Sequence, residues 1–182
     1  AKLVYVDLGK VSEYAAWAKS LGYVEVTNLE LEAASFEAAE RQYLQGNNKE
    51  AMTALDNYLK EFPNGMRRTN AEFYKAQLYF NEGKKAEALA NYEKVWKSGS
   101  TEYEEQSLTR VCQILLDAGS YLKAKPYLEE LENKATIAQN KTYAQSNLMR
   151  VCYNEKLYDK AIEYANKVLE EKSIDTRIKN DA

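Results

Sequence analysis

The sequence has no histidine and contains only two cysteines and two prolines in 182 residues. Without histidine, catalysis by a histidine-activated nucleophile and metal binding by imidazole are both excluded. The cysteines, Cys112 and Cys152, do not form the closely spaced pair of a redox or zinc motif. Apolar runs are short, and none approaches the roughly 18 residues that a membrane-spanning helix needs. We therefore expect neither a metal site nor direct insertion into a membrane.

An excess of one charge sign and the familiar ligand-binding motifs are lacking as well. The formal net charge is −3, and acidic and basic residues are interleaved. A basic stripe would be expected of a nucleic-acid-binding protein, so nucleic acid is not an expected partner. Phosphate-binding loops, dinucleotide fingerprints and calcium loops are absent from the sequence, so no cofactor is expected. The chain starts with Ala1 rather than Met, which predicts an excised or processed piece whose compartment is unknown.

What the sequence does contain is a repeat. The alanines at 51, 88, 124 and 161 are 37, 36 and 37 residues apart. Five residues before each of the first three stands a glycine, at 46, 83 and 119, and Lys156 takes the fourth place. A fixed period of this length is typical of a stacked helical array, which offers extended surfaces rather than a buried reaction centre.

The segments between these turn signals have the apolar spacing of helices. The expected helices cover residues 11–21, 31–44, 49–61, 70–81, 84–98, 103–117, 121–132, 142–154 and 158–171. Three capping boxes precede expected helices, beginning at Thr27, Thr69 and Thr101. Residues 1–8 fit the tail of a further helix, although their β-branched and aromatic residues also allow a strand. We favour the helix, because an isolated strand would have no partner for its backbone hydrogen bonds.

The repeated two-helix unit resembles the tetratricopeptide repeat. The resemblance is carried by the turns Gly46–Ala51, Gly83–Ala88, Gly119–Ala124 and Lys156–Ala161. Further support comes from small residues in the first helices and large residues four places after the alanines, where Ala165 departs from the pattern. The motif YLKEFPNG at Tyr58–Gly65 is similar to the bacterial cell-envelope branch, which includes TolA-binding and outer-membrane-assembly lipoproteins and large Bacteroidetes repeat proteins. This likeness suggests the periplasm or cell envelope, with the cytoplasm as an alternative.

The resemblance implies an all-α, right-handed solenoid of antiparallel helix hairpins. We expect one array over residues 1–182, with a partial repeat at 1–29, full repeats at about 30–66, 67–101, 102–139 and 140–173, and the start of another at 174–182. Neither end has an evident polar capping helix, which again predicts a piece of a longer array.

In this family the first helices line a concave groove that binds peptides. The matching positions here are Phe36, Glu37, Glu40, Tyr43, Phe73, Tyr74, Gln77, Phe80, Arg110, Gln113, Tyr143, Asn147, Arg150, Tyr153 and Asn154. Tyrosine and arginine are enriched in binding hot spots, and asparagine and glutamine can pair with a peptide backbone. For the phenylalanines, packing against the neighbouring unit is the alternative. Arg110 and Arg150 lack the lysine with which family members clamp a carboxylate.

The cysteines and the carboxylate runs have simpler interpretations. Helix spacing and rise place Cys112 and Cys152 about 10 Å apart, too far for a disulfide, so both are expected to be small buried side chains. The acidic runs at 102–105 and 129–132 are expected on solvated helix faces rather than in an acid–base pair.

The favoured function is non-enzymatic binding of a protein or peptide. The alternatives are an accessory or structural repeat region that positions a catalytic or other domain elsewhere in the protein.

Overall fold

The computed structural model describes residues 2–22, 28–99 and 102–170, and within these ranges it contains ten α-helices and no strand. The chain divides into two compact parts, unit 1 (residues 1–98) and unit 2 (residues 99–182), which we describe separately. The all-α class and the helix-hairpin architecture expected from the sequence are confirmed. Residues 174–182, expected to begin another repeat, lie outside the described ranges.

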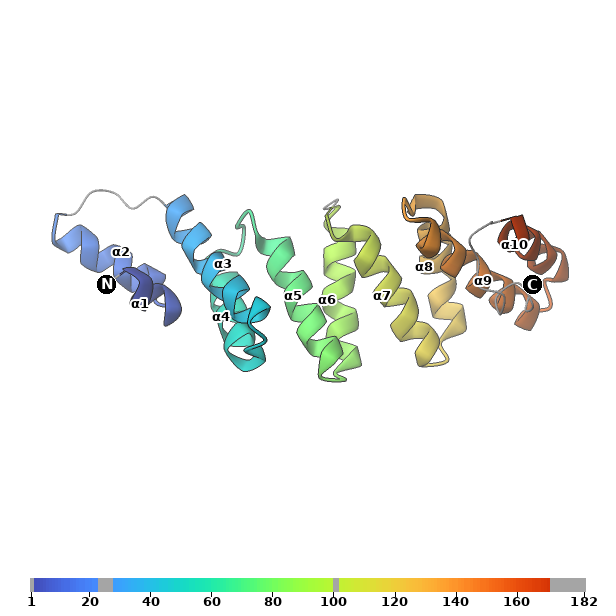
Figure 1. Ribbon diagram of the computed structural model, residues 1–182, viewed down its shortest axis with the longest axis horizontal. Coiled ribbons are helices and arrows are strands. Elements are labelled where there is room, and N and C mark those ends of the chain that lie inside the picture. Colours follow the sequence, from blue (N-terminus) through green and yellow to red (C-terminus); the bar gives the residue numbers. More distant parts are fainter. Residues whose placement is uncertain (1, 23–27, 100–101, 171–182) are drawn as a thin grey trace. The chain divides into compact units, whose positions relative to one another are not determined.

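Unit 1 is built from six helices (Figure 1): α1 (Lys2–Asp7), α2 (Val11–Ser20), α3 (Asn28–Leu44), α4 (Asn48–Glu61), α5 (Arg68–Asn81) and α6 (Lys85–Lys97). Within this unit α3 packs against α4, α4 against α5 and α5 against α6, while α1 packs against both α2 and α3. The first residues are therefore helical, as favoured above, and the alternative strand is wrong.

The described residues of unit 2 form four helices: α7 (Glu104–Asp117), α8 (Tyr121–Lys134), α9 (Ala138–Asn154) and α10 (Tyr158–Glu170). Within this unit α7 packs against α8, α8 against α9 and α9 against α10. Their bounds differ from the expected ranges chiefly at the start of α9, which begins four residues earlier than its apolar pattern suggested.

The repeated turns all have the same backbone geometry. At Gly83, with φ of 75°, the amide donates to the carbonyl of Phe80, and the next amide, of Lys84, donates to the carbonyl of Tyr79. This is the Schellman arrangement, which requires a left-handed residue at the end of the helix. Lys156 makes the same pair of bonds with φ of 61°, although it is not glycine. The fourth repeat therefore keeps the turn without its favoured residue.

Alanines lie where the two helices of each hairpin approach each other. Ala51, Ala88 and Ala124 have no exposed surface, and Ala161 is also buried. The positions four and seven residues later in the second helices are buried too, and they hold the large side chains of the core: Leu55, Tyr58, Tyr92, Val95, Leu128, Leu131 and Val168, with the small Ala165 as the exception. The repeat period thus identifies the core face of every second helix.

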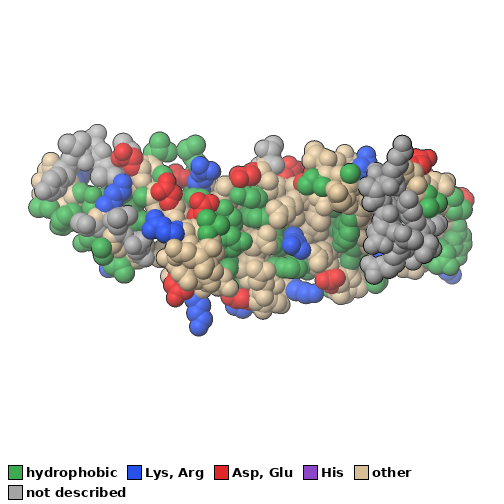
Figure 2. Space-filling model, viewed as in Figure 1, with side chains coloured by type: hydrophobic (Ala, Val, Ile, Leu, Met, Phe, Trp, Pro, Cys, Tyr) green, Lys and Arg blue, Asp and Glu red, His purple; other side chains and the backbone are tan. Residues whose placement is uncertain are grey.

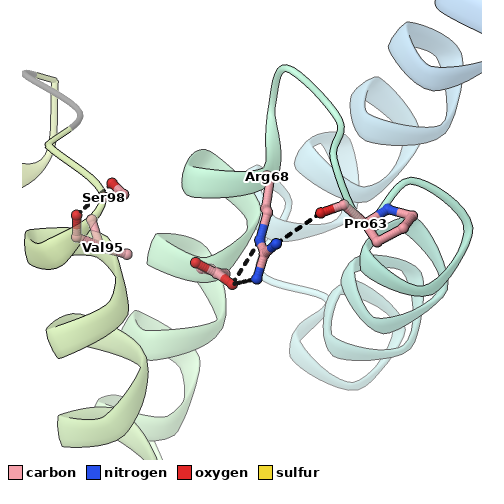
Figure 3. A network of polar contacts seen from close by, with 5 residues as sticks. Pro63, Arg68, Val95 and Ser98 are labelled. Carbon is pink, nitrogen blue, oxygen red and sulfur yellow. Dashed lines mark hydrogen bonds and ion pairs between the residues drawn. The ribbon is translucent and has the colours of Figure 1, made fainter.

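The predicted capping box at Thr69 is wrong, because α5 begins at Arg68 and includes Thr69. Arg68 holds this helix start instead (Figure 3): its guanidinium donates to the carbonyl of Pro63 at 2.8 Å and to the Glu72 carboxylate at 3.1 Å. The same figure shows the end of α6, where the Ser98 hydroxyl donates to the Val95 carbonyl. The boxes at Thr27 and Thr101 fall on residues outside the described ranges.

Two carboxylates of the acidic runs bind groups that come from other parts of unit 2. Glu105 accepts hydrogen bonds from the backbone amides of Thr136 and Ile137 and from both the Thr136 hydroxyl and the Asn140 amide. Glu132 pairs with Lys167 at 3.1 Å. The solvated-face prediction is therefore wrong for Glu132, whose side chain is only 13% exposed, whereas Glu105 makes its bonds at the surface. Both side chains connect helices that are far apart in sequence.

Candidate functional site

The predicted groove residues of unit 1 form an aromatic stack between α3 and α5. The Tyr74 ring lies parallel to Tyr43, with centroids 4.4 Å apart, and to Phe36, at 6.1 Å. The Tyr74 hydroxyl donates to Glu40 at 2.7 Å. Burial raises the pKa of Tyr43. These four residues, which come from two successive first helices, therefore lie together.

Three further groove residues of unit 1, Phe73, Gln77 and Phe80, contact Tyr92 of α6. Phe73 and Phe80 meet its ring edge-on, and its hydroxyl donates to Gln77 at 3.0 Å. Phe73 and Phe36 are each only 4% exposed, so they have the packing role given above as the alternative, whereas Phe80 is half-buried.

In unit 2 the polar groove residues pair with one another. Arg110 donates to Gln113 at 2.7 Å on α7, and the Asn147 amide donates to the backbone carbonyl of Tyr143 on α9. Burial, together with the nearby Cys112 and the carboxylate of Asp117, raises the pKa of Tyr143 to about 12, against the opposing effect of Arg110. Tyr143 is therefore an uncharged hydrogen-bonding group near Arg110 at neutral pH.

The last three predicted residues line a hollow of about 660 Å³ between α9 and α10, which we call the α9–α10 hollow. Its lining residues are Met149, Arg150, Tyr153, Asn154, Tyr158, Ala161, Ile162 and Ala165. Tyr153 is 64% exposed and meets Tyr158 edge-on at 5.8 Å. An aromatic pair, an aliphatic side chain and two hydrogen-bonding side chains therefore converge on one open space.

A small residue helps to open this hollow. The position four residues after the repeat alanine holds Leu128 in α8 but Ala165 in α10, so the α10 side chain is shorter by three carbon atoms. Leu128 has no exposed surface, whereas Ala165 lines the hollow. The departure of Ala165 from the repeat pattern was therefore the signal in the sequence for this site.

A second hollow, of about 530 Å³, lies along α3 in unit 1, and we call it the α3 hollow. Its lining residues are Leu29, Glu32, Ala33, Phe36, Glu37, Glu40, Met66 and Arg67. Three of them, Phe36, Glu37 and Glu40, were expected from the family groove. Met66 and Arg67 were missed, because the segment before α5 carries no helical periodicity that would orient them. Leu29 was missed because the expected helix began only at residue 31, whereas α3 begins at Asn28.

A buried polar cluster lies beneath the α3 hollow. The Tyr58 hydroxyl donates to Glu32 at 2.8 Å, and the Arg67 amide donates to the Tyr58 oxygen at 3.0 Å. Burial and the Glu32 carboxylate raise the pKa of Tyr58, so this phenol remains a donor. Gly65 approaches so closely that a Cβ there would lie 2.6 Å from the Tyr58 oxygen. The cluster fixes the loop that presents Met66 and Arg67.

The described residues offer no sign of a metal site or of a membrane span. They include no group of three or more cysteine, aspartate or glutamate side chains placed to hold a metal ion. None of the helices that the structure describes is both long and apolar enough to cross a bilayer. On the face drawn in Figure 2, acidic and basic side chains are mixed among hydrophobic ones. Cys112 and Cys152 are both buried free thiols.

Comparison with known proteins supports tetratricopeptide repeats in this chain. The tetratricopeptide repeat family model matches residues 33–65 and 70–98, which lie in the hairpins α3–α4 and α5–α6. No curated protein sequence matches the chain.

Solved structures of such proteins share its fold. YrrB, described as a tetratricopeptide repeat protein with an unusual peptide-binding site, is 18% identical with a TM-score of 0.59, over 76% of this chain and 68% of YrrB. A putative kinesin light chain from Podosopora anserina, with nearly identical tetratricopeptide-like repeats, is 18% identical with a TM-score of 0.55, over 90% of this chain and 88% of that protein.

Proposed function

We propose that this chain is a non-enzymatic scaffold of tetratricopeptide repeats that binds a protein or peptide partner. The observation that carries the proposal is the α9–α10 hollow, where the predicted groove residues Arg150, Tyr153 and Asn154 meet an exposed apolar surface. Arginine and tyrosine are among the residues most enriched at binding hot spots. The peptide-binding site of YrrB, on a similar fold, supports the same kind of ligand.

The physical advantage of such a site is that its side chains are already ordered. Tyr153 and Tyr158 contact each other and come from two helices that pack together, so their backbones need not be ordered on binding. An apolar side chain of the peptide would fill the space beside Ala165, while Arg150 and Asn154 would bind its backbone or a carboxylate.

We also propose that the chain belongs to the bacterial cell-envelope branch of the family. The motif at Tyr58–Gly65 supports a place in the bacterial cell-envelope branch of the family, where the scaffold would take part in envelope assembly.

The function is tested by selecting peptides from a random displayed library on the wild-type protein. The selected peptide is then titrated by calorimetry against Arg150→Ala and Tyr158→Ala. Each substitution is expected to weaken binding by about tenfold, which corresponds to about 1.4 kcal/mol.

The matched control is Tyr121→Ala, which changes an exposed tyrosine at the same repeat position, 37 residues before Tyr158. It should leave the affinity unchanged, and melting curves should show that all three variants fold. Failure to enrich any peptide would contradict the function. Equal affinities for all variants would contradict its assignment to the α9–α10 hollow.

A further inference from the structure

We propose that the α3 hollow binds a basic amphipathic peptide segment, with lysine or arginine side chains paired to Glu37 and Glu40 and apolar side chains on Leu29 and Met66. The inference rests on the proposed function in that its ligand is a peptide, but it concerns a different unit and names the chemistry of the partner.

Charge is the first reason. Among the lining residues that the structure describes, the three carboxylates of Glu32, Glu37 and Glu40 face one guanidinium, that of Arg67. Glu32 is engaged by Tyr58, and Glu40 accepts from Tyr74, while Glu37 is exposed at the opening. Complementary charge selects a basic partner, because an acidic one would be repelled at the same distance.

The aromatic floor is the second reason. The Arg67 guanidinium carbon lies 6.0 Å from the centroid of the Phe36 ring, within the range of a cation–π contact. One cation of the chain itself is therefore already accommodated beside this ring. A second cation that enters next to Glu37 and Glu40 has these two carboxylates to offset its charge.

The apolar rim is the third reason. Leu29 is 61% exposed and Met66 is 78% exposed, and they come from α3 and from the loop before α5. Single exposed apolar residues are common on protein surfaces, but these two border the same hollow. A segment crossing the hollow would contact both, and methionine adapts easily to the shape of a partner. Alternating basic and apolar side chains fit this arrangement.

The probe for the test is a fluorescein-labelled amphipathic peptide of lysine and leucine, and its counterpart is the same peptide with glutamate in place of lysine. Binding is measured by fluorescence anisotropy at low and high salt. We expect the lysine peptide to bind, with an affinity that falls as the salt concentration rises, and the glutamate peptide not to bind. Binding of both peptides with similar affinity would overturn the proposal, since it would show attraction to apolar surface alone.

The site is located with Glu37→Gln and with the double variant Glu37→Gln/Glu40→Gln, in which the amide at position 40 still accepts from Tyr74. The matched control is Glu50→Gln/Glu87→Gln, which removes two exposed carboxylates elsewhere in unit 1. The double variant should weaken binding of the lysine peptide by about tenfold or more, and the control by less than about twofold. An equal loss in both would mean diffuse charge attraction and would overturn the proposal, as would unchanged binding.

The apolar contribution is tested with Leu29→Ser and Met66→Ser, which change exposed side chains and should not alter melting. Each substitution should weaken binding of the lysine peptide by several-fold. Unchanged affinity in both variants would contradict the amphipathic part of the proposal. If the lysine peptide fails to bind while the library-selected peptide still binds the α9–α10 hollow, this inference fails and the proposed function stands. Failure of both peptides would reject the function itself.

Discussion

At the scale of single residues, Glu105 shows how a carboxylate from one helix fixes the segment that leads into another. Ile137 precedes α9 and has no side-chain oxygen with which to cap it. The Glu105 carboxylate, brought by α7, accepts from the Ile137 amide at 3.1 Å and from the Thr136 amide at 2.9 Å. Burial alone would raise the pKa of Glu105, but the hydrogen bonds from Asn140, Thr136 and Ile137 outweigh it and lower that pKa.

We expect Glu105→Gln to reduce the free energy of unfolding at neutral pH by about 1–3 kcal/mol, because hydrogen bonds to a charged acceptor are lost. The folded-state pKa is lowered, so the stabilisation is present above the unfolded-state value and is lost as the pH falls through the folded-state value. Urea unfolding from pH 7 to pH 3 should therefore show the two proteins converging below about pH 4.

The control for this measurement is Glu129→Gln, an exposed carboxylate of α8. It should alter stability little at any pH. A constant difference between wild type and Glu105→Gln across the whole range would contradict the role given to the charge.

At the scale of elements, the hairpin turns at the four repeat positions share one backbone conformation, which glycine adopts in three of them and lysine in the fourth. Gly46, Gly83 and Gly119 have φ between 67° and 76°, and Lys156 has φ of 61°. A side chain is strained in this region, whereas glycine adopts it without steric cost. The turn between α9 and α10 is therefore expected to be the least favourable of the four.

Lys156→Gly should raise the free energy of unfolding by about 0.5–1 kcal/mol by relieving this strain. Gly83→Lys is the reverse experiment and should lower it by a similar amount. A Cβ at Gly83 would meet nothing within 4 Å, so the loss would report the backbone conformation rather than a clash. Urea midpoints measure both changes. A destabilised Lys156→Gly variant would show that the lysine side chain contributes more than its strain costs.

The boundaries of these elements were largely predictable from sequence, while one helix contains an unexpected residue. Turn glycines, apolar spacing and the repeat alanines indicated nearly every helix end, because these signals act within a few residues. Pro126 lies inside α8, although proline removes a helical hydrogen bond. The packing of α8 against α7 and α9 holds this helix together, and such packing cannot be inferred from local propensity.

At the scale of the whole molecule, each unit carries its own spectroscopic or chemical reporter. The chain has two tryptophans, Trp17 and Trp96, both in unit 1. Cys112 and Cys152 are both in unit 2 and are at most 1% exposed. Burial raises the pKa of Cys112 to about 12, which further suppresses its reaction with thiol reagents.

We expect the two thiols to be unreactive in the folded protein and both to titrate in denaturant without reductant. Tryptophan fluorescence and thiol reactivity, followed in parallel against urea, should give different midpoints, because repeat arrays are stabilised by contacts between neighbouring elements rather than by one shared core. Coincident transitions would show instead that the two units unfold as one.

The sequence by itself determined the helical class, the repeat period, the turn positions and the core face of each second helix. These depend on local backbone conformation and on spacing along a helix, which are present in any short stretch of chain. The tertiary structure decided which groove residues are buried and which remain accessible: Phe36 and Phe73 became core, while Arg150, Tyr153 and Asn154 line a hollow. It also decided that Glu105 binds the backbone just before α9 and that Leu29, Met66 and Arg67 surround one space. The physical reason is that burial and these contacts depend on side chains brought together from separate elements, and the period of a single helix does not encode that packing.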